Sequence, residues 1–273
     1  MDKSRSPEIL GVELECPACK KLEKAAARVP VGRVIEKLDS LFAKNDLSGA
    51  ERLIEYWTTE AITLGDLSGE LSLVNEMLGL SRRLGNAEKA RAAIDRALVL
   101  IDLTGMNTSV SGATILLNAA TTEKAFGAPD RAVPLYERTA DIYKAERLNE
   151  KDPKYAALYN NYATTLTDLG QFEKAEALYQ KAIALTREAK NLPDCAVTAV
   201  NMAHLYEAWE SIESQKITDC LAHAEHLLLE ECADRTPYFA FVAEKCAPAF
   251  DYFGHFFVAN QLREIARKIY EGT

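Results

Sequence analysis

Six small residues recur about every 42 positions, and this period constrains the fold more than any other feature of the chain. They are Ala50, Ala90, Ala132, Ala175, Ile217 and Ala259. A second column follows seven residues later: Trp57, Ala97, Thr139, Ala182, Ala224 and Ala266. Self-similarity at a fixed period of this size indicates stacked supersecondary units. Such stacks form extended concave binding surfaces more often than catalytic pockets.

The unit that covers residues 155–186 shows the local pattern most clearly. Apolar residues recur at steps of three and four over 155–169 and again over 172–186, which predicts two helices. Gly170 separates them, and glycine past a helix end tolerates the positive φ that a tight turn needs. Alanine at the crossing, here Ala175, allows two helices to approach closely. We therefore expect each unit to be a helix, a tight turn and an antiparallel helix.

The same unit resembles the tetratricopeptide repeat family. The residues that carry the resemblance are, in order, Leu169, Gly170, Phe172, Ala175, Tyr179 and Ala182. The period near 42 and the run over 159–163 are similar to the longer repeats of kinesin light chains. The resemblance covers about Val31 to Tyr270. It implies an all-α fold, a right-handed α–α superhelix (a TPR-like solenoid) of about six helix pairs.

We expect one repeat domain over residues 31–273, preceded by a leader or cap over residues 1–30 in which 22–29 form a short helical piece. Two units depart from the pattern. In the fifth, the stretch 210–214 replaces the two-residue turn. In the sixth, Pro248 lies inside the first helix, where a kink is expected.

Composition and motifs exclude several classes of function. The net charge of −9 and the lack of a basic cluster argue against a nucleic-acid partner. No apolar run reaches 18 residues, so no membrane span is predicted. The first five residues lack an apolar core, which favours a cytoplasmic location over secretion. No phosphate loop, dinucleotide fingerprint or hydrolase motif occurs, so we expect no enzyme and no cofactor.

Three clusters of Cys, His or Glu residues are candidates for metal or catalytic sites. Cys16 and Cys19 form a C-x-x-C pair, which would be half of a zinc site, a redox pair, or two reduced thiols in a leader. Cys220, His223 and His226 follow one side of a helix but climb about 9 Å, too far for three ligands of one ion. The adjacent Glu230 and Glu231 are expected to point to different faces of a helix.

An asparagine recurs at one position in three consecutive first helices. The residues are Asn118, Asn161 and Asn201, followed one turn later by Thr121, Thr164 and His204. By the family resemblance, the first helix of each pair lines the concave face. An amide offers both donors and acceptors, which suits the backbone of an extended peptide. In the other interpretation, each asparagine bonds a neighbouring helix and stiffens the stack.

The same helical offsets place further polar residues on that face: Asn75, Arg82, Arg83, Lys124 and Lys245. Cations there would hold a partner's carboxylates. The sequence thus predicts a non-catalytic scaffold that binds a protein or an extended peptide segment in its groove. Alternatives are a peptide sensor whose superhelix changes shape, and a metal- or thiol-linked assembly through Cys16 and Cys19. A homodimer through the aromatic sixth unit is also compatible with the sequence.

Overall fold

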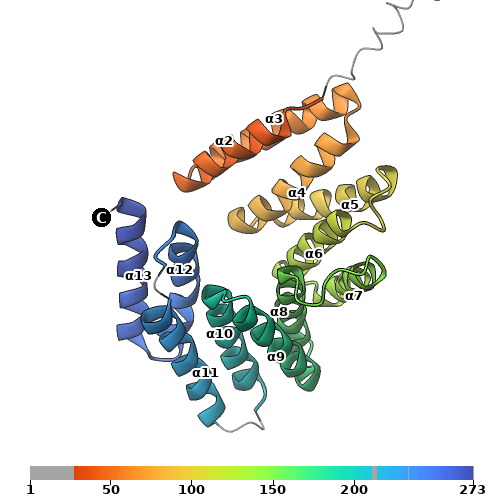
Figure 1. The fold of residues 1–273 in the computed structure, drawn as a ribbon. Coiled ribbons are helices and arrows are strands. Elements are labelled where there is room, and N and C mark those ends of the chain that lie inside the picture. Colours follow the sequence, from red (N-terminus) through yellow and green to blue (C-terminus); the bar gives the residue numbers. More distant parts are fainter. Residues whose placement is uncertain (1–27, 211–213, 233, 273) are drawn as a thin grey trace, which may run out of the picture. The chain divides into compact units, whose positions relative to one another are not determined.

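The computed structural model describes residues 28–210, 214–232 and 234–272 (Figure 1). Within these ranges every regular element is a helix, and no strand occurs. Most of the predicted helical piece over 22–29 lies outside the described residues, and Arg28 and Val29 are not helical. Cys16 and Cys19 also lie outside the described part.

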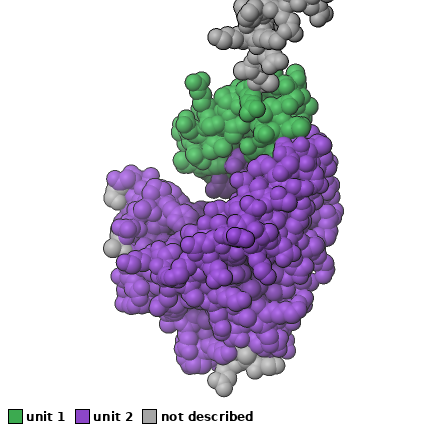
Figure 2. Space-filling model, turned by 45° about the vertical axis from the view of Figure 1, so that its right-hand side comes forward, with its two compact units in different colours: residues 1–73 green, residues 74–273 purple. Residues whose placement is uncertain are grey.

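The chain divides into two compact units, residues 1–73 and 74–273 (Figure 2). The first unit holds α2 (Val31–Ala43), α3 (Leu47–Leu64) and the beginning of α4 (Leu67–Leu84). The rest of α4 belongs to the second unit. A domain boundary near residue 31 remains a prediction.

After α4, the second unit continues with one further helix, which completes the second predicted pair, and then with four more helix pairs in the described residues. Its helices are α5 (Ala87–Leu103), α6 (Val110–Ala125), α7 (Pro129–Ala145), α8 (Pro153–Asp168), α9 (Phe172–Glu188), α10 (Leu192–Ala208), α11 (Ser214–His226), a π-helical turn η1 (Leu227–Glu231), α12 (Pro237–Tyr252) and α13 (Phe256–Glu271). The strongest packing joins α6 to α7, α8 to α9, and α12 to α13. Each of these contacts joins the first and second helices of one predicted unit. The all-α solenoid class is confirmed.

The period of small residues is a packing feature of the second helices. Ala132, Ala175 and Ala259 are fully buried, each in the first turns of α7, α9 and α13. Ile217, the exception in the column, is only partly buried against the core of the last pairs. Small side chains therefore occupy fully buried positions near the start of these second helices, as the spacing predicted.

The turns also follow the sequence pattern. Gly170 adopts φ 69° and Asn45 adopts φ 53°, both in the left-handed region. Glycine reaches this region without steric cost, and asparagine reaches it more readily than most other residues. Helix α12 runs without interruption through Pro248, which lies on its exposed side. Water can serve the carbonyl that loses its N–H partner there.

Candidate functional site

The predicted groove residues all lie on first helices of their pairs. Asn75 and Arg82 are on α4, Asn118, Thr121 and Lys124 on α6, Asn161 and Thr164 on α8, Asn201 and His204 on α10, and Lys245 on α12. These residues differ in the hydrogen bonds and ion pairs that they make.

Two of the asparagines bond a neighbouring first helix. The Asn118 amide nitrogen donates to the Asn75 side-chain oxygen at 2.8 Å. The Asn201 amide nitrogen donates to the side-chain oxygen of Asn160 at 3.0 Å. Each bond joins the first helices of adjacent pairs, which is the stiffening role left open by the sequence. Asn161 differs, because its oxygen receives only a long 3.4 Å contact from Asn160.

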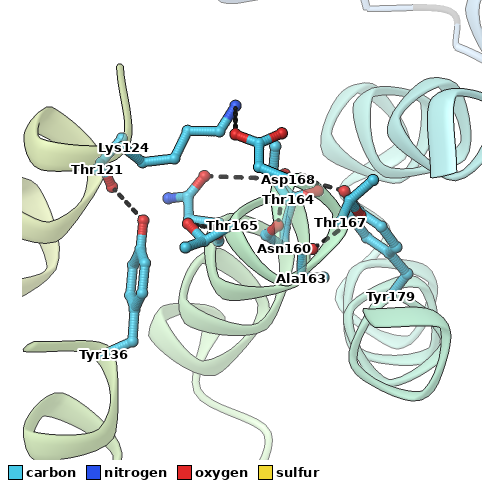
Figure 3. Close-up of polar contacts among 11 residues, drawn as sticks. Thr121, Lys124, Tyr136, Asn160, Ala163, Thr164, Thr165, Thr167, Asp168 and Tyr179 are labelled. Carbon is cyan, nitrogen blue, oxygen red and sulfur yellow. Dashed lines mark hydrogen bonds and ion pairs between the residues drawn. The ribbon is translucent and has the colours of Figure 1, made fainter. Parts of the chain in front are cut away.

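The threonines tie the two helices of one pair together (Figure 3). The Tyr179 hydroxyl donates to Thr164 Oγ1 at 3.0 Å, and Thr121 Oγ1 lies 3.3 Å from the Tyr136 hydroxyl. Both tyrosines are almost completely buried. Burial raises the pKa of Tyr179 to about 12. These threonines therefore support the stack, with their hydroxyls already engaged.

Most of the predicted cations are engaged as well. The half-buried Arg82 guanidinium donates to the Asn118 carbonyl at 3.2 Å and to Thr122 Oγ1 at 2.8 Å. Burial lowers the Arg82 pKa. Lys124 pairs with Asp168 at 3.2 Å (Figure 3). Arg83 lies exposed at the end of α4.

Lys245 is the contrasting case, because it borders a cavity of about 190 Å³. The cavity lies among the first helices α8, α10 and α12. Its other lining residues include Ala157, Asn160, Asn161, Val197, Tyr238 and Phe241. Lys245 is exposed and makes no ion pair with the residues that the structure describes. Lys245 and Asn161 therefore both line the cavity, and neither the Lys245 ammonium nor the Asn161 amide nitrogen bonds a described residue.

The acidic group in the cavity is already satisfied. The Tyr238 hydroxyl donates to one Asp194 carboxylate oxygen, and the Asn191 amide donates to the other at 2.8 Å. Burial and the bond to Asp194 raise the pKa of Tyr238. The Tyr238 and Phe241 rings stack at 6.3 Å, and about half of each side chain is exposed. The cavity thus offers apolar walls, an amide and one cation.

Comparison with known proteins identifies one segment of the chain with a repeat family. Residues 154–214 match the model of the tetratricopeptide repeat. This segment is a tetratricopeptide repeat region. It contains α9, α10 and nearly all of α8, and each of these helices contributes residues to the cavity. The predicted family resemblance is confirmed.

Solved structures of such repeats share the fold. BtubC (BKLC) from P. vanneervenii is 19% identical, with a TM-score of 0.52, over 84% of this chain and 91% of that one. A putative kinesin light chain of nearly identical TPR-like repeats from Podosopora anserina is 19% identical, with a TM-score of 0.50, over 72% of this chain and 92% of that one. At this identity the likeness concerns the fold alone. The sequence matches no curated protein.

Sequence reasoning missed several residues of the cavity. Tyr238 and Phe241 belong to the aromatic sixth unit, which the sequence offered only as a dimer contact, yet they share a helical face with Lys245 at steps of three and four. That spacing was the signal that would have found them. Asn160 was overlooked because alignment with the other units selected its neighbour, Asn161.

The expectation for Glu230 and Glu231 is wrong. Both carboxylates lie 2.9 Å from His226, one at each ring nitrogen. The cause is the π turn η1, whose i to i+5 hydrogen bonding stacks residue 231 above residue 226. His223 instead lies 2.9 Å from the Arg187 guanidinium. Within the described ranges, no three His, Cys, Asp or Glu side chains are grouped to hold a metal ion.

No helix in the described ranges combines the length and the apolar character that a membrane crossing requires.

Proposed function

We propose that this protein is a non-catalytic scaffold that captures an extended peptide segment of a partner protein in the cavity among α8, α10 and α12. Tetratricopeptide repeats act as protein-interaction scaffolds in general, which supports the class. One observation carries the proposal: at the border of the cavity Lys245 makes no ion pair and the Asn161 amide nitrogen donates no hydrogen bond to the described residues, whereas the other predicted groove residues Lys124 and Asn118 are engaged inside the protein.

The size of the cavity indicates what it would take. An engineered apolar cavity of roughly 150 Å³ holds benzene. A cavity of about 190 Å³ therefore has room for one large apolar side chain against Tyr238 and Phe241. The Asn161 amide would bond the peptide backbone, which presents the same groups in every sequence. Lys245 would pair with an acidic side chain beside the apolar one.

Panning a library of random 12-residue peptides on phage tests this function. The wild-type protein should enrich peptides that contain a large apolar residue close to Asp or Glu. The double variant Asn161→Ala, Lys245→Ala should bind the enriched peptides at least about tenfold more weakly, because it loses a hydrogen bond and an ion pair. Lys174→Ala on α9, which removes an exposed lysine outside the cavity, is the matched control.

Two results would reject the proposal. The first is a library that enriches nothing over the double variant. The second is a set of enriched peptides whose affinity falls equally in Lys174→Ala and in the double variant.

The proposal includes a cytoplasmic location and a protein partner. Cys195, Cys220, Cys232 and Cys246 are free thiols, which is usual in a reducing compartment. The net charge of −9 supports a partner other than nucleic acid.

A further inference from the structure

Helix α12 exposes one face along its whole length. The residues on this face are Tyr238, Phe241, Lys245, Pro248 and Tyr252, at successive steps of three, four, three and four. We call this face the α12 stripe. Tyr238 and Tyr252 are 49% and 65% exposed, which is unusual for large aromatic side chains. At 1.5 Å per residue the stripe is about 21 Å long, and the cavity borders only one end of it.

The far end of the α12 stripe is an ordered aromatic corner. The Tyr252 ring meets the Phe253 ring edge-on at 5.1 Å and lies 5.6 Å from the His204 ring. The Tyr252 hydroxyl donates to the Glu207 carboxylate on α10. The other carboxylate oxygen of Glu207 lies 3.6 Å from Nδ1 of His204. The ring is therefore held in place while most of its surface stays open.

The two ends of the stripe are built alike. Tyr238 donates to Asp194 at one end of α10, and Tyr252 donates to Glu207 near the other end. Each tyrosine hydroxyl thereby satisfies one oxygen of a carboxylate on α10. Between them stands Lys245, which makes no ion pair with the described residues. The stripe thus complements a ligand that is apolar at both ends and acidic in the middle.

We propose that the aromatic corner of His204, Tyr252 and Phe253 is a second subsite for the peptide that binds the cavity. This inference rests on the proposed function. The ligand is an extended segment that lies along α12, with one large apolar side chain in the cavity and another on Tyr252. An acidic residue between them pairs with Lys245. An extended chain advances about 3.3 Å per residue, so roughly six residues separate the two apolar anchors.

Fluorescence anisotropy with the enriched 12-residue peptides tests the second subsite. The matched variants are Tyr252→Ala and Tyr270→Ala. Tyr270 is also an exposed tyrosine whose hydroxyl points to a glutamate, Glu244 at 3.5 Å, but it lies on α13, outside the stripe. Tyr252→Ala should weaken binding about five- to tenfold, as expected for an aromatic anchor, and Tyr270→Ala should leave it unchanged.

Peptide length provides the second readout. The affinity of each enriched peptide is compared with that of a shorter peptide, the half that contains the apolar residue proposed to enter the cavity. The wild-type protein should bind the full peptide more tightly than the half, and Tyr252→Ala should bind both equally. If Tyr252→Ala binds the full peptide like wild type while Asn161→Ala, Lys245→Ala does not, the second subsite is wrong and the proposed function stands. If neither change affects binding, both are wrong.

Discussion

The middle and the end of the repeat stack use their polar side chains differently. In α6 to α9 the threonines bond buried tyrosines and Lys124 pairs with Asp168. In α10 to α13 the pattern is irregular: a π turn follows α11, and exposed aromatics surround Lys245. In the regular pairs, most of these polar side chains hold helices together. Where the repeat departs from its pattern, Lys245 and the exposed aromatics have no such role, and we propose that they contact the ligand.

The alanine column gives the sharpest contrast between the two regions. Ala175 is fully buried, whereas the fifth pair has the larger Ile217 at the same position. Ala175→Ile should lower the free energy of unfolding by about 1–3 kcal/mol, because the crossing has no room for three more carbons. Urea denaturation measures this. Ala184→Ile, an exposed site on the same helix, should cost only the helix-propensity difference, below about 0.7 kcal/mol. Equal losses at the two sites would contradict a close crossing at Ala175.

The tyrosines of the two regions should also respond differently. Tyr179→Phe removes a buried hydroxyl that donates to Thr164, and should cost about 0.5–1.5 kcal/mol. Tyr252→Phe removes an exposed hydroxyl and should stay within about 0.5 kcal/mol of wild type. Urea unfolding of both variants measures these two changes in the free energy of unfolding. A larger loss for Tyr252→Phe would mean that the end of the stack depends on polar bonds as much as the middle.

The sequence predicted the regular part of this molecule well. The fold class and the positive φ at Gly170 and Asn45 followed from periodicity and backbone sterics. These features depend on short-range spacing, which a sequence displays directly. The candidate site was harder to predict from the sequence than the fold. An asparagine that bonds its neighbour and one that lines a cavity look identical in a sequence. Asn118 and Asn161 occupy the same column, and only the side-chain partners in three dimensions separate them.

The π turn was not foreseen for the same reason. Nothing in the run 227–231 distinguishes it from an α-helix by apolar spacing. Its register depends on contacts made by other segments. Arg235 donates to the Leu228 carbonyl at 2.8 Å and stacks over the Phe239 ring.

A smaller effect should appear in the pH dependence of stability. Burial and the nearby Arg187 lower the pKa of His223. The folded protein then binds this proton less readily than the unfolded chain, so the stabilising contribution is present above about pH 6.5 and is lost as the pH falls. His223→Gln keeps an acceptor for Arg187 but cannot titrate. Urea midpoints at pH 7.5 and 5.5 should differ less in His223→Gln than in wild type, and equal differences would contradict the pKa shift.

One pair of variants tests the central claim that equivalent asparagines do different work. Asn118→Ala should lower the free energy of unfolding by about 0.5–1.5 kcal/mol, because it removes the bond to Asn75, and should leave the affinity for a library-selected peptide unchanged. Asn161→Ala should leave stability within about 0.5 kcal/mol of wild type and weaken peptide binding about three- to tenfold. Measuring unfolding and binding of both variants side by side is the most direct test. If Asn161→Ala destabilises the fold without affecting binding, or Asn118→Ala abolishes binding alone, the account is wrong.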